Sequence, residues 1–463
     1  MTDARDLIEC KDQLVEHLTI GMKPRDKWLI GTEHEKFAFL RDGVLPVGFH
    51  GEHGIEAVLK GLMEGPGDYS GIFEGERLIG LLKPSACGAF SASVSLEPGG
   101  QFELSGAPLA SVHQTRDELQ THLTDVTQVA GPMGIDFLGL GYSPKFSLEQ
   151  TPQMPKGRYD VMRAYMPKVG NLGLNMMHCT ATMQVNLDYS SEADMVKKFR
   201  VGLALQPLST ALFANSVFKE GRLNGYHSYR SHVWLDVDSD RTGMLPFVFQ
   251  EGMGFEAYVD YALNVPMYFV YRDGRYLNTH GASFADFLAG KIEFEDKVYP
   301  TIDDWDVHLT TLFPEVRLKR FLEMRGADGG AVPFILAHSA LWTGLLYHDG
   351  ALDAAYDLIK SWDEEVRQRF RREVPERGLK TVVAGHKGLD LAKEVIGMAE
   401  EGLQARGVVN DAGHNEVVYL EPLKEIVDDG WAQSDRLIDL YKNVWREDVH
   451  QVFQRDVFVP ELV

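Results

Sequence analysis

Residues 30–39 have the sequence IGTEHEKFAF, in which two glutamates are separated by a single residue. In an extended strand, residues two positions apart point to the same face, so Glu33 and Glu35 would share one face. Paired carboxylates on a rigid face are hard oxygen ligands of the kind that Mg²⁺ prefers. The pattern predicts a strand with a candidate metal site, and the alternative is a solvated strand face that binds nothing.

A second acidic segment, SVSLEPGGQFEL, lies at residues 93–104. Its Pro-Gly-Gly sequence at 98–100 can reverse the chain, which leaves Glu97 on one arm of a hairpin and Gln101 and Glu103 on the other. Glu103 stands between two apolar residues, the alternation of a half-buried strand. Because such a carboxylate must meet water or find a partner, the segment is either part of a metal site or an ordinary hairpin.

A third segment, ATMQVNLD at 181–188, alternates polar and apolar residues, with Gln184 and Asn186 on the polar side. Strict alternation of this kind is typical of a strand with one apolar face and one hydrogen-bonding face. The polar face is either exposed to solvent or forms the floor of a polar pocket.

The fourth segment, FPEVRLKRFLEMRGAD at 313–328, contains two Glu-x-Arg pairs. In each pair a carboxylate and a guanidinium would share a strand face, able to bind a metal and a substrate carboxylate or phosphate side by side. Ordinary ion pairing on one face is the alternative. The pairs are Glu315 with Arg317 and Glu323 with Arg325.

The familiar phosphate-binding motifs are missing from the chain. There is no GxxxxGK[ST] loop and no strand–GxGxxG–helix unit, so metal ions and basic side chains would have to hold a nucleotide. Four acid-bearing strands favour one shared site for metal and polyphosphate. Lys156 and Arg158, in a basic stretch of an acidic protein, are candidates for phosphate contacts, and a charged loop and helix surface is the alternative.

Residues 229–236, YRSHVWLD, are interpreted as a strand on which Arg230 and Trp234 share a face. Trp234 and Arg241 could together frame an amino-acid substrate. A lone tryptophan, however, more often belongs to a core.

The formal charge is −22, from 46 Lys+Arg against 68 Asp+Glu. Such a surface repels phosphate backbones and anionic lipid, which disfavours nucleic-acid and membrane-surface binding. No run of residues approaches the 18 or so apolar positions of a membrane span. With 44% hydrophobic residues, the chain has ample material for a core.

Three cysteines, Cys10, Cys87 and Cys179, are an odd number without CxxC spacing. They exclude a disulfide framework and a zinc ribbon, and they suit a reducing compartment. The first residues, MTDARDLIECKDQLVEHL, are charged throughout and lack the apolar stretch of a signal peptide. We therefore expect a cytoplasmic protein.

Strand and helix signals follow one another without a regular βαβ alternation, and no linker or internal repeat divides the chain. This order predicts an α+β fold, with a mostly antiparallel sheet backed by helices. We expect an N-terminal helix (1–26), a catalytic α+β body (27–330) and a helical C-terminal region integrated with it (331–463). Within these parts we expect a first helix capped by Asp3, strands over 27–105, helices over 111–129 and 191–213, strands over 226–276, and helices from 332.

Long segments of the chain resemble the plant-type glutamate–cysteine ligases, which also occur in many bacteria. The resemblance covers nearly the whole chain from about residue 27. The motifs that carry it are GTEHEKF (31–37), EPGGQFELSGAPL (97–109), MPKGRYDVMRAYMPKVG (154–170), QVNLDYSSEADMVKKFRVGLALQPLSTALFANS (184–216), RSHVWLDVDSDRTGMLPFVF (230–249), FEAYVDYALNVPMYFVYR (255–272) and FPEVRLKRFLEMRGAD (313–328).

The resemblance implies a catalytic body like that of glutamine synthetase, a curved antiparallel sheet with helices outside. The Mg²⁺ ligands that it implies are Glu33, Glu35, Glu97, Glu103 and Glu323. The substrate contacts expected are Trp234, Arg241, Arg325, Gln184, Asn186 and Arg230, the nucleotide contacts Lys156 and Arg158, and the catalytic residues Arg241, Arg325 and Glu103.

The activity implied is ligation of the γ-carboxylate of glutamate to the amine of cysteine, with ATP and Mg²⁺, through a γ-glutamyl phosphate. This reaction is the first step of glutathione biosynthesis; the alternative is a related carboxylate–amine ligase with a different amine. The expected partners are ATP, glutamate and cysteine, bound by a monomer or homodimer. The disulfide switch and transit peptide of the plant enzymes are expected to be absent, which favours a bacterial cytoplasmic enzyme.

Overall fold

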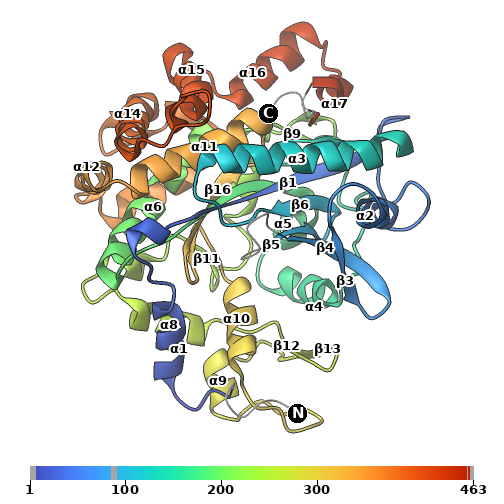
Figure 1. Ribbon diagram of the computed structural model, residues 1–463, viewed down its shortest axis with the longest axis vertical. Coiled ribbons are helices and arrows are strands. Elements are labelled where there is room, and N and C mark those ends of the chain that lie inside the picture. The colour runs from blue at the N-terminus through green and yellow to red at the C-terminus, as the bar shows by residue number, and fades with distance from the viewer. Residues whose placement is uncertain (1–6, 85–90, 456, 459–463) are drawn as a thin grey trace.

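The centre of the molecule is a ten-stranded sheet in which every pairing is antiparallel (Figure 1). The computed structural model describes residues 7–84, 91–455 and 457–458. The strand order is β15 (Val316–Leu318), β16 (Leu322–Asp328), β8 (Thr182–Leu187), β1 (Ile30–Leu40), β6 (Gln101–Ser105), β5 (Ser91–Leu96), β4 (Arg77–Pro84) and β3 (Ser70–Glu74), while β2 (Leu45–Pro46) and β7 (Ile135–Leu138) also pair with β1.

Strand β1 is the longest strand and joins both halves of the sheet. Its first half, 30–34, pairs with β8, and residues 33–37 pair with β6 on the other side. Its last residues pair with β7 and β2. The stretch predicted as a strand at 30–39 is therefore the central strand of the sheet.

Helices cover one face of the sheet, where α3 (Val112–Ala130) and α11 (Val332–Leu346) lie across β1 (Figure 1). Thr32 Oγ1 lies 2.8 Å from Ser339 Oγ of α11, and Lys36 Nζ lies 3.1 Å from His122 Nε2 of α3. Because side chains alternate along a strand, Glu33 and Glu35 point to the opposite face, away from these helices. The predicted α+β fold, a mostly antiparallel sheet with helices outside, is confirmed.

The other elements surround this sheet. The helices are α1 (Lys11–Thr19), α2 (Ile55–Glu64), α4 (Gly157–Tyr165), α5 (Gly173–Cys179), α6 (Glu192–Leu212), α7 (Tyr229–Val233), α8 (Phe255–Asn264), α9 (Phe284–Leu288), α10 (Ile302–Thr310), α12 (Asp349–Ile359), α13 (Glu364–Arg377), α14 (Gly388–Arg406), α15 (Glu421–Asp429), α16 (Gln433–Asp439) and α17 (Val452–Arg455). Short two-stranded pairs are β9 (Phe218–Lys219) with β10 (Arg222–Leu223), β11 (Thr242–Gly243) with β14 (Phe313–Pro314), β12 (Phe269–Arg272) with β13 (Arg275–Asn278) and β17 (Val382–Val383) with β18 (His386–Lys387).

Two predicted helix starts are confirmed by their caps. Ser111 accepts a 3.2 Å hydrogen bond from Gln114 N at the start of α3, and Ser191 accepts one of 3.2 Å from Asp194 N at the start of α6. A cap hydroxyl of this kind satisfies an amide that has no partner inside the helix. Helix α3 ends at Ala130, one residue beyond the predicted end and directly before Gly131 and Pro132, which do not favour a helix.

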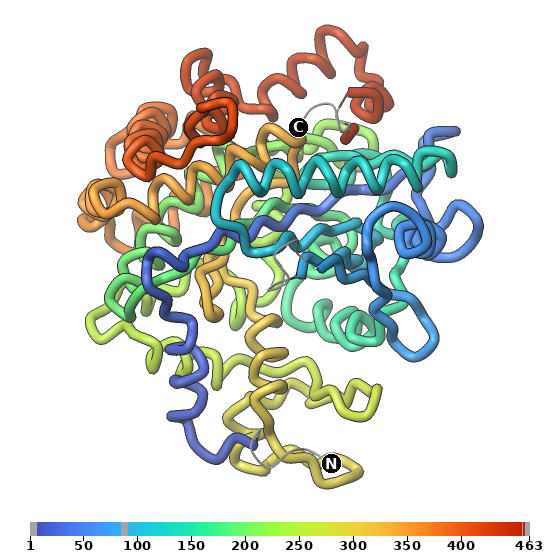
Figure 2. The backbone as a smooth tube through the Cα atoms, viewed as in Figure 1, coloured from blue at the N-terminus to red at the C-terminus, as the bar shows by residue number. Residues whose placement is uncertain are grey.

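The first helix begins later than expected, at Lys11 rather than after Asp3, and Asp3 and Cys87 lie outside the described residues. Helix α1 is bound to α8 through Lys11 Nζ, which lies 2.8 Å from Glu256 Oε1 and 2.7 Å from Asp260 Oδ1. Figure 2 shows this N-terminal segment running along one end of the molecule, opposite the C-terminal helices.

The prediction of strands over 226–276 is wrong for most of that range. The segment contains α7 and α8, and its strands are limited to the two-residue β11 and the β-hairpin at 269–278. Ser228 caps α7 by accepting a 3.1 Å hydrogen bond from Ser231 N, and five residues are too few for alternation to distinguish a strand from a helical turn. Arg230 and Trp234 still share a face, because residues four apart are neighbours on a helix.

Helices dominate the chain from α11 onward. No helix in the described part of the chain is both long enough and apolar enough to cross a lipid bilayer. The boundary drawn at residue 331 stays a prediction, because α11 packs directly against the sheet through the Thr32–Ser339 contact.

That contact is a testable link between β1 and α11, since both hydroxyls are buried. Replacing Thr32 by Val removes this partner of Ser339, whose hydroxyl keeps only a 3.3 Å hydrogen bond to Ile335 O, and should lower the free energy of unfolding by about 1–2 kcal/mol. The double variant Thr32→Val/Ser339→Ala should cost clearly less than the sum of the single changes, because no polar group is then left unpaired. Urea denaturation measures all three, and strictly additive effects would contradict the link.

Candidate active site

The structure brings all four acid-bearing segments into one sheet, on the face opposite α3 and α11. Residues that oppose each other in antiparallel strands share a face. Glu35 opposes Glu103 of β6, and Glu33 opposes Gln184 of β8. Across the next pair of strands, Glu323 of β16 opposes Asn186 of β8. The register therefore sets carboxylates and amides in adjacent rows on one surface.

Glu33 is held by the two amides predicted to lie on this floor. Gln184 Nε2 donates to Glu33 Oε2 at 3.0 Å, and Asn186 Nδ2 donates to Glu33 Oε1 at 2.7 Å. Burial, together with the negative charges of Glu323 and Glu103, raises the pKa of Glu33 to about 7. Asn186 Oδ1 is buried without a hydrogen-bond partner among the described residues, so an acceptor remains free beside this carboxylate.

Glu35, Glu97 and Glu103 form the next group. Ser95 Oγ donates to Glu103 Oε2 at 2.6 Å, and Ser105 Oγ donates to Glu103 Oε1 at 3.0 Å. Burial and the charge of Glu97 raise the pKa of Glu103. Burial and the charges of Glu97 and Glu103 raise the pKa of Glu35 well above its usual range. The three carboxylates therefore repel one another on one surface.

None of the four carboxylates at Glu33, Glu35, Glu97 and Glu103 forms an ion pair with a described lysine, arginine or histidine. Removing a carboxylate from water without a compensating cation is costly, so the buried members of this group favour a cation from outside the chain. A cation with a preference for oxygen ligands fits this donor set. Among the described residues, no three acidic, histidine or cysteine side chains already converge as a closed metal site.

Glu323 differs from these four because cations of the chain surround it. Arg317 binds it with both ends of its guanidinium, at 3.0 Å through Nε and 2.7 Å through Nη2, and Lys319 Nζ lies 3.2 Å away. Arg325 Nη1 donates to it as well. Burial alone would raise the pKa of Glu323, but these three cations hold it below its usual range. Glu323 is therefore ion-paired within the chain, and its predicted metal contact stays a prediction.

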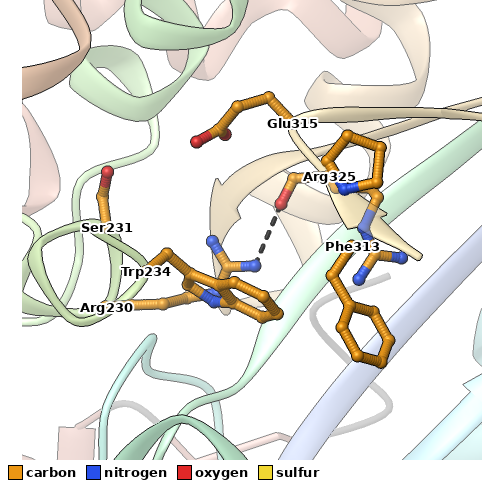
Figure 3. A pocket seen from close by; sticks show the side chains of 7 residues that line it. Arg230, Ser231, Trp234, Phe313, Glu315 and Arg325 are labelled. Atoms are coloured by element: carbon orange, nitrogen blue, oxygen red, sulfur yellow. Dashed lines mark hydrogen bonds between the residues drawn. The ribbon is translucent and has the colours of Figure 1, made fainter. Parts of the chain in front are cut away.

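A pocket opens beside this ion-pair cluster, between α7 and the segment from β14 to β16 (Figure 3). Arg230 Nη2 donates to the main-chain oxygen of Arg325 at 2.9 Å, and its guanidinium lies 5.9 Å from the centre of the Trp234 ring. Arg230 Nε and Trp234 Nε1 are buried donors with no partner in the described chain. The pocket is lined by Arg230, Ser231, Trp234, Phe313, Pro314, Glu315 and Arg325.

Arg325 connects the pocket with the carboxylate rows. Its Nη1 donates to Gln184 Oε1 at 2.6 Å, and Gln184 in turn binds Glu33. The side chain lines the pocket and contacts Glu323. A ligand in the pocket would therefore lie next to the rows of carboxylates.

Asp328, which sequence analysis did not single out, fixes α7 in this position. Its Oδ1 accepts from Ser228 Oγ at 2.7 Å, and its Oδ2 accepts from Ser216 Oγ at 2.6 Å. Ser228 caps α7, and Ser216 accepts a 3.1 Å hydrogen bond from the amide of Arg230. Asp328 thus holds the start of the helix that carries Arg230 and Trp234.

Of the two Glu-x-Arg pairs predicted along 313–328, Glu323 with Arg325 forms, whereas Glu315 and Arg317 pair with other residues. Glu315 accepts from Arg371 Nε of α13 at 2.6 Å, and Arg371 Nη2 donates to the main-chain oxygen of Trp234 at 3.1 Å. Arg317 crosses the hairpin to Glu323 instead of joining Glu315. Arg371 is another residue that the sequence did not reveal, because it lies in a charged helix remote in sequence from the pocket.

Arg241 is not among the residues that line this pocket, and its predicted substrate contact and catalytic role stay predictions. Its side chain is fully buried over the Tyr268 ring, at 3.9 Å. Nε donates to Asp238 at 2.6 Å, Nη1 to Thr311 O at 3.1 Å and Nη2 to Pro266 O at 2.7 Å. With these partners the guanidinium holds three chain segments together.

The predicted phosphate contacts lie at the Glu97 end of the rows. Lys156 Nζ donates to Leu96 O at 2.8 Å, and burial lowers its pKa, while Glu97 and Glu103 are close enough to oppose that shift. Arg158, at the start of α4, has its Nε buried without a described partner. Both cations therefore lie near the carboxylates, and a role in nucleotide binding stays a prediction.

Comparison with known proteins identifies similar chains. The family model of glutamate–cysteine ligase family 2 (GCS2) matches residues 29–455. Chloroplastic glutamate–cysteine ligase B of Oryza sativa subsp. japonica is 50% identical over 444 residues, which cover 96% of this chain and 86% of that protein. The chloroplastic glutamate–cysteine ligase of Arabidopsis thaliana is 49% identical over 96% of this chain and 82% of its own length.

A solved structure shares the fold. The glutamate–cysteine ligase of Francisella tularensis, in complex with AMP, superposes with a TM-score of 0.54 over 92% of this chain and 88% of that chain. The sequence identity is 12%, so this likeness concerns the fold alone.

One prediction from the sequence is wrong: the cytoplasmic location is contradicted by the plant relatives, which are chloroplastic proteins. The cysteine count argues against an oxidising compartment. It does not distinguish one reducing compartment from another, which is why the prediction was wrong.

The buried position of Arg241 leads to a prediction about stability. Arg241→Lys removes at least two of the three hydrogen-bonded contacts, because an ammonium cannot reproduce the planar fork. We expect the free energy of unfolding to fall by about 2–4 kcal/mol. The matched control is Arg372→Lys, whose side chain is 54% exposed and pairs with Glu365, and which should change stability by under about 0.5 kcal/mol. Equal effects of the two changes, measured by chemical denaturation, would contradict the structural role of Arg241.

Proposed function

Because the chain belongs to glutamate–cysteine ligase family 2, we propose that it joins the γ-carboxylate of glutamate to the amine of cysteine with ATP and Mg²⁺. The observation that carries this proposal is the row of carboxylates without cationic partners beside a pocket lined by arginines. The first suits metal-bound phosphates, and the second suits an anionic amino acid.

Four residues would hold Mg²⁺: Glu33, Glu35, Glu97 and Glu103. Their fit rests on three features of the chain: oxygen donors, partial or full burial, and no ion pair to a described cation. When bound, Mg²⁺ supplies positive charge that offsets the phosphate oxygens gathered for transfer. Glu323 is left out of this set because Arg317, Lys319 and Arg325 already neutralise it.

Glutamate would occupy the pocket beside Arg325. Arg230 and Trp234 offer two buried donors without partners, a usual means of holding a carboxylate. Because Arg325 reaches Gln184 and Glu323 on the sheet, a glutamate held here would direct its γ-carboxylate toward the carboxylate rows. Lys156 and Arg158 would meet phosphates of ATP from the Glu97 end.

The reaction follows from this placement in two steps. An oxygen of the glutamate γ-carboxylate attacks the terminal phosphorus of ATP, the bond to ADP breaks, and an acyl phosphate forms. The cysteine amine then attacks the acyl carbon, phosphate leaves with the bonding electron pair, and the amine proton passes to a base. The arginines of the chain hold the reacting carboxylate while like charges converge.

The reaction is tested by ATP-dependent phosphate release with glutamate and Mg²⁺, with and without cysteine, alongside mass detection of the dipeptide. We expect phosphate and γ-glutamylcysteine to form one for one, and only when cysteine is present. Phosphate release with another amine, but none with cysteine, would mean that the substrate amine is not cysteine, while the proposed ligase reaction would still hold. Phosphate without any amide would contradict the ligase proposal.

Two variants distinguish the carboxylates that are proposed to bind Mg²⁺ from Glu323, which is ion-paired. Glu35→Gln removes a charge that burial already disfavours, so the metal-free protein should be no less stable than wild type at pH 7.5. It should lose the thermal stabilisation that MgCl₂ gives the wild type, and with it the activity. Glu323→Gln should instead cost about 3–5 kcal/mol, because it leaves buried cations unpaired.

Thermal unfolding with and without MgCl₂ measures both variants. A carboxylate whose pKa is raised in the fold destabilises the fold above its unfolded pKa, and removing the charge relieves that penalty. A Glu35→Gln variant that keeps the full response to MgCl₂ would remove Glu35 from the proposed metal ligands.

A further inference from the structure

Glu315 is the one acidic side chain among the residues that line the pocket of Arg230, Trp234 and Arg325. Its side chain is 14% exposed. One oxygen, Oε1, accepts from Arg371 Nε at 2.6 Å, and Oε2 has no hydrogen bond to any described residue. Figure 3 shows the Glu315 carboxylate and Ser231 bordering the same hollow as Arg230 and Trp234.

This placement is unfavourable for a ligand that carries only negative charge. Two arginines attract carboxylates, whereas Glu315 in the same small pocket repels them in a weakly screened environment. A carboxylate can accept up to about four hydrogen bonds, so Arg371 does not exhaust it. The combination matches a ligand with a carboxylate and an ammonium on neighbouring atoms, which is an α-amino acid.

Building on the proposed function, we infer that Glu315 binds the α-ammonium group of the glutamate substrate and so selects an α-amino acid over a plain dicarboxylate. Arg230 and Trp234 would hold the α-carboxylate, and the γ-carboxylate would extend past Arg325 toward the sheet. Arg371 acts as a positioning residue, since it holds Glu315 and the main-chain oxygen of Trp234 at the same time.

The competing explanation is that Glu315 only fastens α13 to the pocket through Arg371. Both explanations predict that replacing Glu315 is harmful, so total activity alone does not decide between them. They differ in selectivity: an ammonium contact matters for glutamate and is irrelevant to glutarate, which has the same two carboxylates and no amine. A fastening role would affect both substrates alike.

The experiment compares L-glutamate and glutarate as acyl donors for the full chain, by kcat/KM in cysteine-dependent phosphate release. Wild type should prefer glutamate by roughly 10- to 100-fold, the range of a charge-assisted hydrogen bond. In Glu315→Gln the value for glutamate should fall by that factor, while the value for glutarate changes by less than about threefold. Glu315→Asp keeps the charge and should restore part of the preference.

Arg371→Gln is the matched control, because it removes the partner of Glu315 and leaves the carboxylate in the pocket. It should lower the preference for glutamate less than Glu315→Gln does, because the carboxylate is still present although the partner that positions it is gone. Equal losses for both donors in Glu315→Gln, or a wild type that uses glutarate as well as glutamate, would overturn the inference.

Ligand-induced thermal shifts with each donor, in the absence of ATP, separate this inference from the proposed reaction. If wild type releases no phosphate but is stabilised by glutamate more than by glutarate, and Glu315→Gln loses that difference, the ligase reaction fails and the ammonium contact stands. If glutamate stabilises no more than glutarate, the ammonium contact fails whatever the reaction is.

Discussion

The structure depends on the electrostatic strain of placing several carboxylates of one sign on one face of a sheet. Burial and the charges of neighbouring carboxylates raise the pKa values of Glu33, Glu35 and Glu103, which means that the folded chain alone does not satisfy their charge. Such an arrangement persists only where the surrounding fold is rigid enough to impose it. Here the rigidity comes from β1, which pairs with four other strands, and from the helices behind it.

In the neighbouring ion-pair cluster, by contrast, a buried glutamate is neutralised by cations of the chain itself. Glu323 is fully buried, yet three cations surround it and its pKa is lowered. The strands that carry Glu33 and Glu323 are separated only by β8, so the sheet places an unsatisfied carboxylate beside a satisfied one. A candidate metal ligand is therefore distinguished from a structural ion pair by the charged side chains that contact the carboxylate. The position of the carboxylate in the strand pattern does not distinguish the two.

This distinction also explains what the sequence could and could not predict. Alternation and turn residues predict the segments around Glu33, Glu103 and Gln184 because those signals are local. The partners of Glu323 depend on the register of the β15–β16 hairpin, and the position of Arg371 depends on how α13 packs. Local sequence patterns therefore predict neither. The helix at 229–233 was missed for a related reason: a five-residue segment is decided by its Ser228 cap, which binds Asp328 a hundred residues away.

The reverse face of β1 adds a last electrostatic element. Lys36, one residue from Glu35 and therefore on the opposite face, is fully buried between His34 and His122. Burial lowers its pKa to about 7, and only the charges of Glu103 and Glu35, acting through the sheet, oppose that shift. The lysine and the carboxylates thus stabilise each other's charged forms across the thickness of one strand. A proton or a cation bound on the face of Glu35 and Glu103 consequently changes the pKa of Lys36, which lies on the other face of the sheet.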